Sequence, residues 1–212
     1  MRTVLLTGFE PFDQDTINPS WEAARPLDGT LVGDVRIVAR QLPCAFAQAP
    51  EQLQQLLDEF GPELVIAVGL GPGRADICIE RVAININDAR IPDNLGYQPI
   101  DTPVVAQGPA AYFSTLPIKA MVQAIRAAGI PASVSHTAGT FVCNQVFYYL
   151  QHVLAGTAVR SGFIHVPALP QQAVQCGGPS MTQTTLVEGL RISVISALNT
   201  TDDVLESGGQ IS

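Results

Sequence analysis

The chain has 212 residues, of which 47% are hydrophobic and 14% charged, and its formal net charge is -8. A chain of this length fits one domain with a single hydrophobic core. The negative charge repels nucleic-acid phosphate and anionic lipid headgroups, so neither nucleic acid nor a membrane is an expected partner. The high apolar fraction predicts that another subunit covers part of the surface, as in a homo-oligomer.

The cysteines and the N-terminus indicate a cytoplasmic protein. The apolar run near the N-terminus is too short for a signal-peptide core, and no stretch approaches the roughly 18 to 20 apolar residues that a membrane span needs. The four cysteines are widely spaced, at Cys44, Cys78, Cys143 and Cys176. A reducing compartment would leave them as four free thiols.

The periodicity of apolar residues predicts alternating strands and helices. Strands are expected at 3–9, 35–42, 63–70, 77–85, 131–137 and 162–166, and helices before Gly61 and Gly129, over 142–154 and over 185–198. This alternation predicts an α/β fold, a mostly parallel twisted sheet with helices on both faces. We expect a single catalytic domain over 1–205 and a loose tail over 206–212.

Cys143 lies where a predicted strand ends, small residues form a tight passage, and a helix begins. Free N–H groups in a first helical turn favour thiolate over thiol and can also form an oxyanion hole. Free cysteines are more often small buried apolar residues. Cys143 is therefore a candidate nucleophile, with a purely structural role as the alternative.

His165 closes an apolar strand, where an imidazole is either a core residue or a general base. Of the three histidines, His152 falls inside a predicted helix and His136 precedes the cysteine segment. His165 is the best candidate base by elimination.

Glu80 interrupts an otherwise apolar strand. A buried carboxylate is costly unless paired, so Glu80 needs Arg81, Arg74 or an imidazole as its partner. It forms either a structural ion pair or the third member of a catalytic triad that orients His165.

No cofactor and no metal are expected. The glycine-rich stretch at 69–74 lacks the last glycine of the dinucleotide-binding pattern, because Arg74 stands there, and a strand rather than a helix follows. There is no CxxC pair and no HExxH motif to supply zinc ligands.

Several long strings together resemble the pyroglutamyl peptidase I family over nearly the full length: TGFEPF at 7–12, NPSW at 18–21, ERVAIN at 80–85, ARIPDN at 89–94, GPAAY at 108–112, TAGTFVCN at 137–144 and GFIHVPALPQQ at 162–172. The resemblance implies a cysteine exopeptidase that removes N-terminal pyroglutamate from peptides without a cofactor. It also implies a homo-oligomer, with a tetramer favoured and a dimer as the alternative.

The resemblance places the catalytic residues on Cys143, His165 and Glu80. It places the substrate pocket on Phe9, Phe12, Asn18, Leu70, Arg90, Ile91, Phe141 and Val142. Within this set, phenylalanines would hold the lactam ring, the backbone carbonyl of residue 70 would accept from the lactam N–H, and Arg90 would assist the oxyanion hole. A free N-terminal ammonium would be left unpaired in such an apolar slot, so strong selectivity is expected.

Two rival interpretations make different predictions. An amidotransferase-like α/β domain would carry a nucleophile elbow with glycine two residues on either side of the cysteine, but Phe141 and Gln145 occupy those positions. A ligand-binding module would have an unreactive Cys143 and no turnover.

Overall fold

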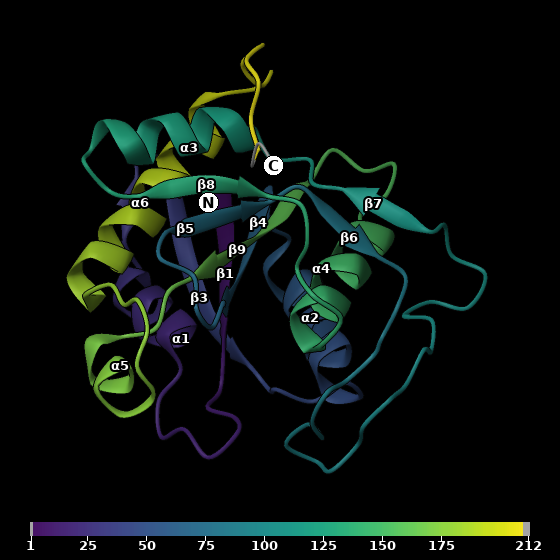
Figure 1. Ribbon diagram of the computed structural model, residues 1–212. Coiled ribbons are helices and arrows are strands. Elements are labelled where there is room, and N and C mark those ends of the chain that lie inside the picture. The colour runs from purple at the N-terminus through teal and green to yellow at the C-terminus, as the bar shows by residue number, and fades with distance from the viewer. Residues whose placement is uncertain (1, 210–212) are drawn as a thin grey trace.

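The structure, a computed structural model, describes residues 2–209 and is a single α/β domain (Figure 1). Its strands are β1 (Arg2–Phe9), β2 (Leu31–Val32), β3 (Val35–Leu42), β4 (Leu64–Leu70), β5 (Ile77–Glu80), β6 (Val82–Ile84), β7 (Ala111–Phe113), β8 (Ala132–Ser135) and β9 (Arg160–Val166). Its helices are α1 (Pro19–Ala24), the short 3-10 helix η1 (Arg25–Leu27), α2 (Gln48–Phe60), α3 (Ile118–Ala127), α4 (Val142–Val153), α5 (Pro170–Cys176) and α6 (Gln183–Asn199).

The main sheet has seven strands in the order β2-β3-β1-β4-β9-β5-β8. Strands β3, β1, β4 and β9 run parallel, whereas β5 runs antiparallel to β9 and carries β8 parallel to itself. The predicted fold class is confirmed, with the refinement that the sheet is mixed at both edges. Strand β9 enters between β4 and β5, although both of those precede it in the chain by many residues.

Helices cover both faces of this sheet (Figure 1). Helices α1, α3 and α6 pack on one face over side chains such as Leu6, Ile66 and Ile164. Helices α2 and α4 pack on the other over Leu5, Ala67 and Phe163. Because side chains alternate across a strand, neighbouring residues of the same strands supply the two cores.

Local sequence explains where several elements begin and end. Helix α2 ends at Gly61, whose φ of 50° is the left-handed conformation that glycine accepts readily, and Pro62 follows. Helix α3 has no cap of its own at Pro117. Instead the carboxylate of Asp203 accepts hydrogen bonds from the N–H groups of Lys119 and Ala120.

Two segments differ in detail from the sequence expectation. The predicted strand over 77–85 divides at Arg81, because β6 leaves the main sheet and pairs with β7 as a separate hairpin. In the tail, Glu206 accepts from Gln123 at 2.6 Å, and the Gly208 carbonyl accepts from Arg81 at 2.7 Å. Residues 210–212 lie outside the described part of the chain.

Among residues 2–209, no helix is long and apolar enough to cross a membrane.

Candidate active site

Glu80 and His165 meet because β5 and β9 are antiparallel neighbours. Cys78 pairs with His165 in register, and Glu80 lies two residues further along β5, so its side chain points to the same face as that of Cys78. The His165 Nδ1 atom lies 2.7 Å from Glu80 Oε1. Glu80 is fully buried and His165 is 4% exposed, so this contact is shielded from solvent.

The charge of Glu80 is balanced by Arg74. The Arg74 guanidinium lies 2.9 Å from the same Oε1 atom that contacts His165. Arg81, the adjacent residue, donates to the tail instead. Of the three partners that the sequence offered for Glu80, the structure selects Arg74 and the imidazole.

Cys143 reaches the same place from α4, where it is the second helical residue. Its sulfur lies against Gly69: a methyl group added at Gly69 would stand 2.7 Å from Cys143 Sγ and 2.9 Å from the Phe163 ring. Gly69 is the register partner of His165 on the neighbouring strand. The thiol packs on Gly69 and therefore lies on the same face of the sheet as the His165 imidazole. The absence of a side chain at Gly69 leaves the space that the sulfur occupies.

Burial sets the protonation of both groups. It raises the pKa of the Cys143 thiol, helped by the negative charge of Glu80 and only partly opposed by Arg74 and by the backbone N–H of Cys143. Burial also lowers the pKa of His165 from 6.5, although Glu80 pulls it upward. The resting thiolate expected from the helix start stays a prediction, which desolvation of the sulfur opposes. Both shifts favour the neutral forms of the two groups, because desolvation against Gly69 and Phe163 acts against the helix start.

The segment that carries Cys143 is fixed on both sides. Thr140 and Asp88 exchange two hydrogen bonds, one from the Thr140 hydroxyl at 2.7 Å and one to the Thr140 carbonyl at 3.0 Å. Asn144 accepts from the Ile84 N–H and donates to the Ile84 and Ile86 carbonyls. The thiol is thus tied to the stretch of chain that follows Glu80.

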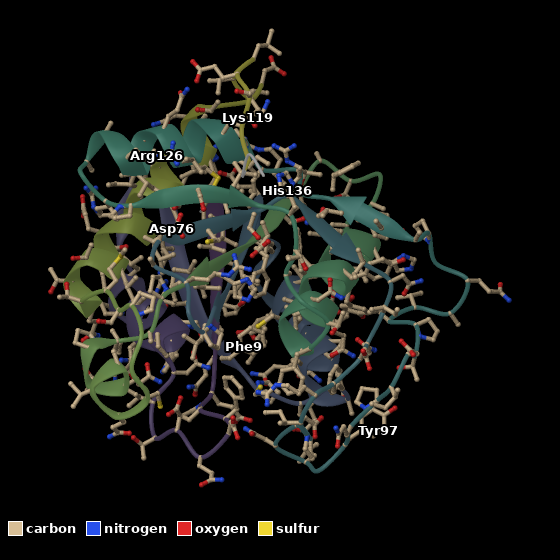
Figure 2. The ribbon with its side chains drawn as sticks, viewed as in Figure 1. Phe9, Asp76, Tyr97, Lys119, Arg126 and His136 are labelled. Atoms are coloured by element: carbon tan, nitrogen blue, oxygen red, sulfur yellow. The ribbon has the colours of Figure 1, made fainter. Side chains whose placement is uncertain are left out.

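Aromatic rings extend from the thiol toward the surface. Phe12 and Phe141 have ring centroids 6.1 Å apart, and Phe46 meets Phe141 edge-on at 5.2 Å. Tyr97 meets the other side of Phe46 at 6.1 Å and is 54% exposed. Figure 2 shows Tyr97 on the outer rim of the long loop and Phe9 nearer the centre of the molecule. Phe9 is buried against Phe163 in the core.

Side chains that bind backbone groups hold these aromatic loops together. Glu10 accepts from the Cys44 N–H and from the Asn94 amide. Asp93 accepts from the N–H groups of Phe46, Leu95 and Tyr97, and the Gln145 amide donates to the Phe46 carbonyl. The loops around residues 10, 46 and 95 therefore form one connected frame.

The other predicted pocket residues occupy varied positions. Asn18 is buried and caps α1 through Ser20, while its amide donates to the Glu10 carbonyl, so it supports the frame from behind. Leu70 follows Gly69 and its side chain therefore points to the opposite face of the sheet, which leaves its backbone as the group available to a ligand. Val142 is buried, Ile91 half-buried and Arg90 exposed.

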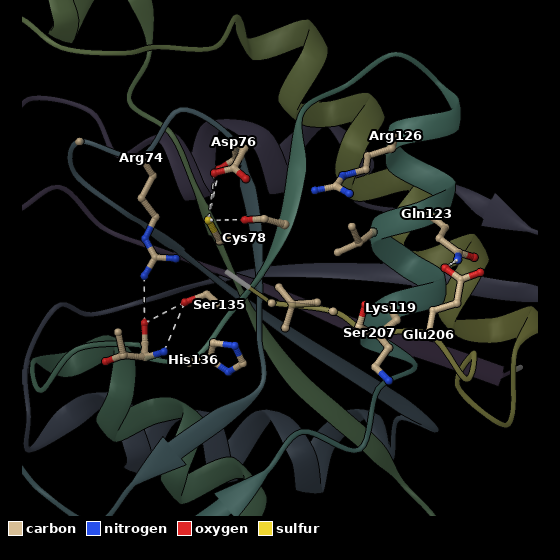
Figure 3. Close-up of a pocket in the computed structure, with 17 residues that line it drawn as sticks. Arg74, Asp76, Cys78, Lys119, Gln123, Arg126, Ser135, His136, Glu206 and Ser207 are labelled. Atoms are coloured by element: carbon tan, nitrogen blue, oxygen red, sulfur yellow. Dashed lines mark hydrogen bonds between the residues drawn. The ribbon is translucent and has the colours of Figure 1, made fainter. Parts of the chain in front are cut away.

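A cavity borders this cluster through Arg74 and Cys78 (Figure 3). Its volume is about 780 Å³, and α3, β5, β8, the loop before β5 and the tail supply its walls. Among residues 2–209 there is no group of three or more His, Cys, Asp or Glu side chains that could hold a metal ion.

Comparison with known proteins shows the family to which the chain belongs. The model of the pyroglutamyl peptidase family, Peptidase_C15, matches residues 2–200. The pyrrolidone-carboxylate peptidase of Pseudomonas fluorescens is 70% identical, with all of both chains covered, and that of Cupriavidus necator is 63% identical over the full length of both. The chain belongs to the pyroglutamyl peptidase family.

Solved structures agree with this assignment. The pyroglutamyl peptidase I of Bacillus amyloliquefaciens is 44% identical and superposes with a TM-score of 0.94, covering 96% of this chain and all of that one. The pyrrolidone carboxyl peptidase of Thermococcus litoralis is 39% identical, with a TM-score of 0.93 over 98% of this chain and all of that one. The family and enzyme class predicted from the sequence are confirmed.

Within this pyroglutamyl peptidase framework, sequence reasoning did not find Phe46, Gly69 or the carboxylates that hold the loops. Phe46 lies in a turn with no periodic pattern, so nothing local marked it. Gly69 was noted only as part of a rejected nucleotide motif, although a glycine at the end of a fully buried strand is itself a sign of close approach by another group.

Proposed function

We propose that the protein hydrolyses the amide bond after an N-terminal pyroglutamyl residue, with Cys143 as nucleophile, His165 as acid and base, and Glu80 as the residue that orients the imidazole. The observation that carries this assignment is the 2.7 Å contact between Glu80 and His165 on the strand beside the Gly69 site that receives the Cys143 sulfur. Three elements converge there, as a nucleophile, a base and an orienting group require.

The contact between Glu80 and His165 defines the order of events. Glu80 accepts from Nδ1–H, which leaves Nε2 of His165 as the proton acceptor. As Cys143 Sγ bonds to the pyroglutamyl carbonyl carbon, its proton passes to Nε2 and the carbonyl oxygen becomes an oxyanion. The first-turn N–H groups of α4 receive that charge.

Collapse of the tetrahedral intermediate breaks the C–N bond, and His165 gives its proton to the leaving amine. Water then attacks the thioester while Nε2 takes one of its protons. The C–S bond then breaks to release free pyroglutamate, and Nε2 returns its proton to the departing sulfur, which restores the thiol.

Selectivity follows from the chemistry of the lactam, which is compact, uncharged and carries one N–H and one C=O. Phe12 and Phe141, backed by Phe46, supply the apolar wall, with Phe9, Ile91 and Val142 around it. The Leu70 carbonyl accepts the lactam N–H. Arg90 is exposed in the substrate-free protein, so its assistance to the oxyanion requires it to turn inward when substrate binds.

We also propose that the protein is a cytoplasmic homo-oligomer, a tetramer rather than a dimer. Exposed apolar side chains on and near the long loop support subunit contact, namely Leu95, Tyr97, Ile100 and Phe113. The four cysteines are all free thiols, which supports a reducing compartment. Light scattering would report the assembly, and a monomer at micromolar concentration would contradict it.

The decisive experiment compares fluorophore release from pyroglutamyl, alanyl and glutamyl amides by the wild type, Cys143→Ala and Cys176→Ser. We expect turnover of the pyroglutamyl amide alone, a loss on the order of 10⁶-fold in Cys143→Ala, and wild-type rates in Cys176→Ser, because Cys176 is exposed. Equal turnover of all three amides, or an active Cys143→Ala, would refute the proposal.

A further inference from the structure

Arg74 occupies a place in the site that the triad does not explain. Its guanidinium lies 2.9 Å from Glu80 Oε1 and also donates to the Thr137 carbonyl at 2.9 Å. Thr137 begins the segment that leads to Cys143, and Figure 3 shows Arg74 reaching from the cavity wall toward that turn. One side chain therefore connects the carboxylate of β5 to the segment that carries the nucleophile.

We propose that Arg74 is a positioning residue of the reaction, which holds Glu80 and the Thr137–Cys143 segment in one geometry and supplies the positive charge against which the thiol ionises. This inference rests on the proposed function. It is distinct from the triad, because Arg74 acts through Glu80 and the backbone rather than on the substrate.

The first part of the argument concerns charge. Glu80 is fully buried, and a neutral imidazole cannot compensate its charge. A buried carboxylate without a cation is costly, and Arg74 supplies that cation to Glu80. Arg74 and His165 contact the same oxygen atom of Glu80, Oε1. Arg74 is a permanent cation, whereas His165 becomes one only when it takes up a proton during turnover.

The second part concerns the thiol. The titratable groups that act on the Cys143–His165 pair are Glu80, Arg74 and the Cys44 thiol. Cys78 lies beside the Arg74 guanidinium, and Asp76 contacts Cys78. The positive charge of Arg74 lowers the pKa of both Cys143 and His165. It therefore favours loss of the thiol proton and keeps the imidazole neutral, which are the two conditions for general-base activation.

The third part concerns the position of the Arg74 side chain, which a substitution at Gly71 can shift without changing Arg74 itself. A methyl group added at Gly71 would lie 2.6 Å from Arg74 Cδ, so Gly71→Ala displaces the side chain while leaving its charge in the protein. The Arg74 side chain is 24% exposed and borders the cavity. A small soluble cation can therefore reach the space that a truncated residue leaves.

The test uses the full chain carrying Cys176→Ser, so that the exposed thiol does not contribute to labelling. Variants Arg74→Gln, Arg74→Lys, Arg74→Ala and Gly71→Ala are compared with Arg191→Gln, which breaks an exposed Arg–Glu pair far from the site. The measurements are kcat and KM on the pyroglutamyl amide, the pH dependence of kcat/KM, and the pH dependence of Cys143 alkylation by iodoacetamide.

Arg74→Gln should lose about 10²-fold in kcat with little change in KM, the size expected when a reacting group is misplaced by about 1 Å. The acid limb of kcat/KM should move to higher pH, because the pKa of His165 rises when a nearby positive charge is removed. Alkylation of Cys143 should move to higher pH for the same reason. Arg74→Lys should keep both pH profiles near the wild type and lose kcat, because an ammonium retains the charge but not the two-sided contact.

Guanidinium chloride, added to Arg74→Ala well below denaturing concentrations, should restore part of kcat, whereas ethylammonium should not. This rescue and Gly71→Ala keep the proposal testable if Arg74→Gln fails to fold. Full activity of Arg74→Gln, or a loss of kcat with both pH profiles unshifted and no rescue, would overturn it. Alkylation needs no substrate, so a failure of the proposed pyroglutamyl activity would be recognised separately, by a wild type that does not turn over the amide.

Discussion

The two faces of the central sheet are built from the same strands but carry different chemistry. Toward α1, α3 and α6 the buried strand residues near the site are hydrocarbon, such as Val68, Ile79 and Ile164. Toward α2 and α4 the neighbouring positions are Gly69, Glu80 and His165. Adjacent residues of one strand therefore have different roles: one packs in the apolar core and the next faces the active site, because alternate side chains point to opposite faces.

The comparison explains how buried ionisable groups are tolerated here. A carboxylate and an imidazole would be costly in either core, but on the α4 face Arg74 pairs with Glu80 and Glu80 pairs with His165. The hydrocarbon face fixes the strands that hold the site. Substitutions on the two faces should consequently have separable effects.

The largest effect on the catalytic face should come from Glu80→Gln. It removes the charge that stabilises the imidazolium and leaves Arg74 without a counter-ion, so kcat should fall about 10⁴-fold. Loss of one partner of a buried pair should also cost about 3–5 kcal/mol in unfolding free energy. Activity is measured per folded molecule, with Glu188→Gln at the exposed pair as the control; retention of wild-type kcat would remove Glu80 from the site.

Gly69→Ala tests the contact between sheet and thiol. The added methyl group would lie 2.7 Å from Cys143 Sγ, so the sulfur must move and kcat should fall about 10²-fold. Ala67→Gly, on the same strand and face, removes atoms instead of adding them and should keep kcat while losing about 1 kcal/mol of stability. Equal kcat in the two variants would show that Gly69 does not place the nucleophile.

The protonation of His165 predicts the pH dependence. Its pKa in the folded protein is lowered from 6.5, so kcat/KM should rise with pH below 6.5 and reach its plateau before that value. Stability should fall as pH drops below 6.5, because the unfolded chain then binds a proton that the folded chain refuses. Titration of kcat/KM and of urea unfolding over this range tests both, and an acid limb above pH 7 would contradict the assignment.

The smallest effect should come from the hydrocarbon face. Ile66→Val removes one buried methylene group and should cost about 0.5–1.5 kcal/mol in unfolding free energy, with kcat and KM unchanged. Urea unfolding and amide turnover measure the two quantities. A loss of kcat comparable to that of Gly69→Ala would mean that the faces are not separable.

The sequence was informative where a pattern is local. Apolar runs and helical spacing predicted the strands and long helices of the core, and the cost of burying Glu80 predicted that it has partners. The choice among Arg74, Arg81 and an imidazole was not local, because it depends on β5 lying antiparallel to β9. The same holds for Phe46, which lies 95 positions before Phe141 in the sequence. Their rings meet only once α2 and α4 have packed.

The direction of the Cys143 pKa shift was hidden from the sequence for a related reason. A helix start can be read from sequence, but the burial of Cys143 between Gly69 and Phe163 cannot, and burial determined the direction of the pKa shift. The break of the strand at Arg81 was likewise hidden, since the hairpin partner β7 lies far along the chain.

The position of β9 has a consequence for how the enzyme acquires activity. Strand β9 lies between β4 and β5. Although β4 and β5 are synthesised early, they do not pair with each other in the native sheet, and both must wait for β9, which is synthesised much later. Glu80 and His165, 85 residues apart in sequence, meet only when that strand is inserted. A growing chain should therefore remain inactive until the sheet closes, and recovery of peptidase activity during refolding should report this late, slow insertion.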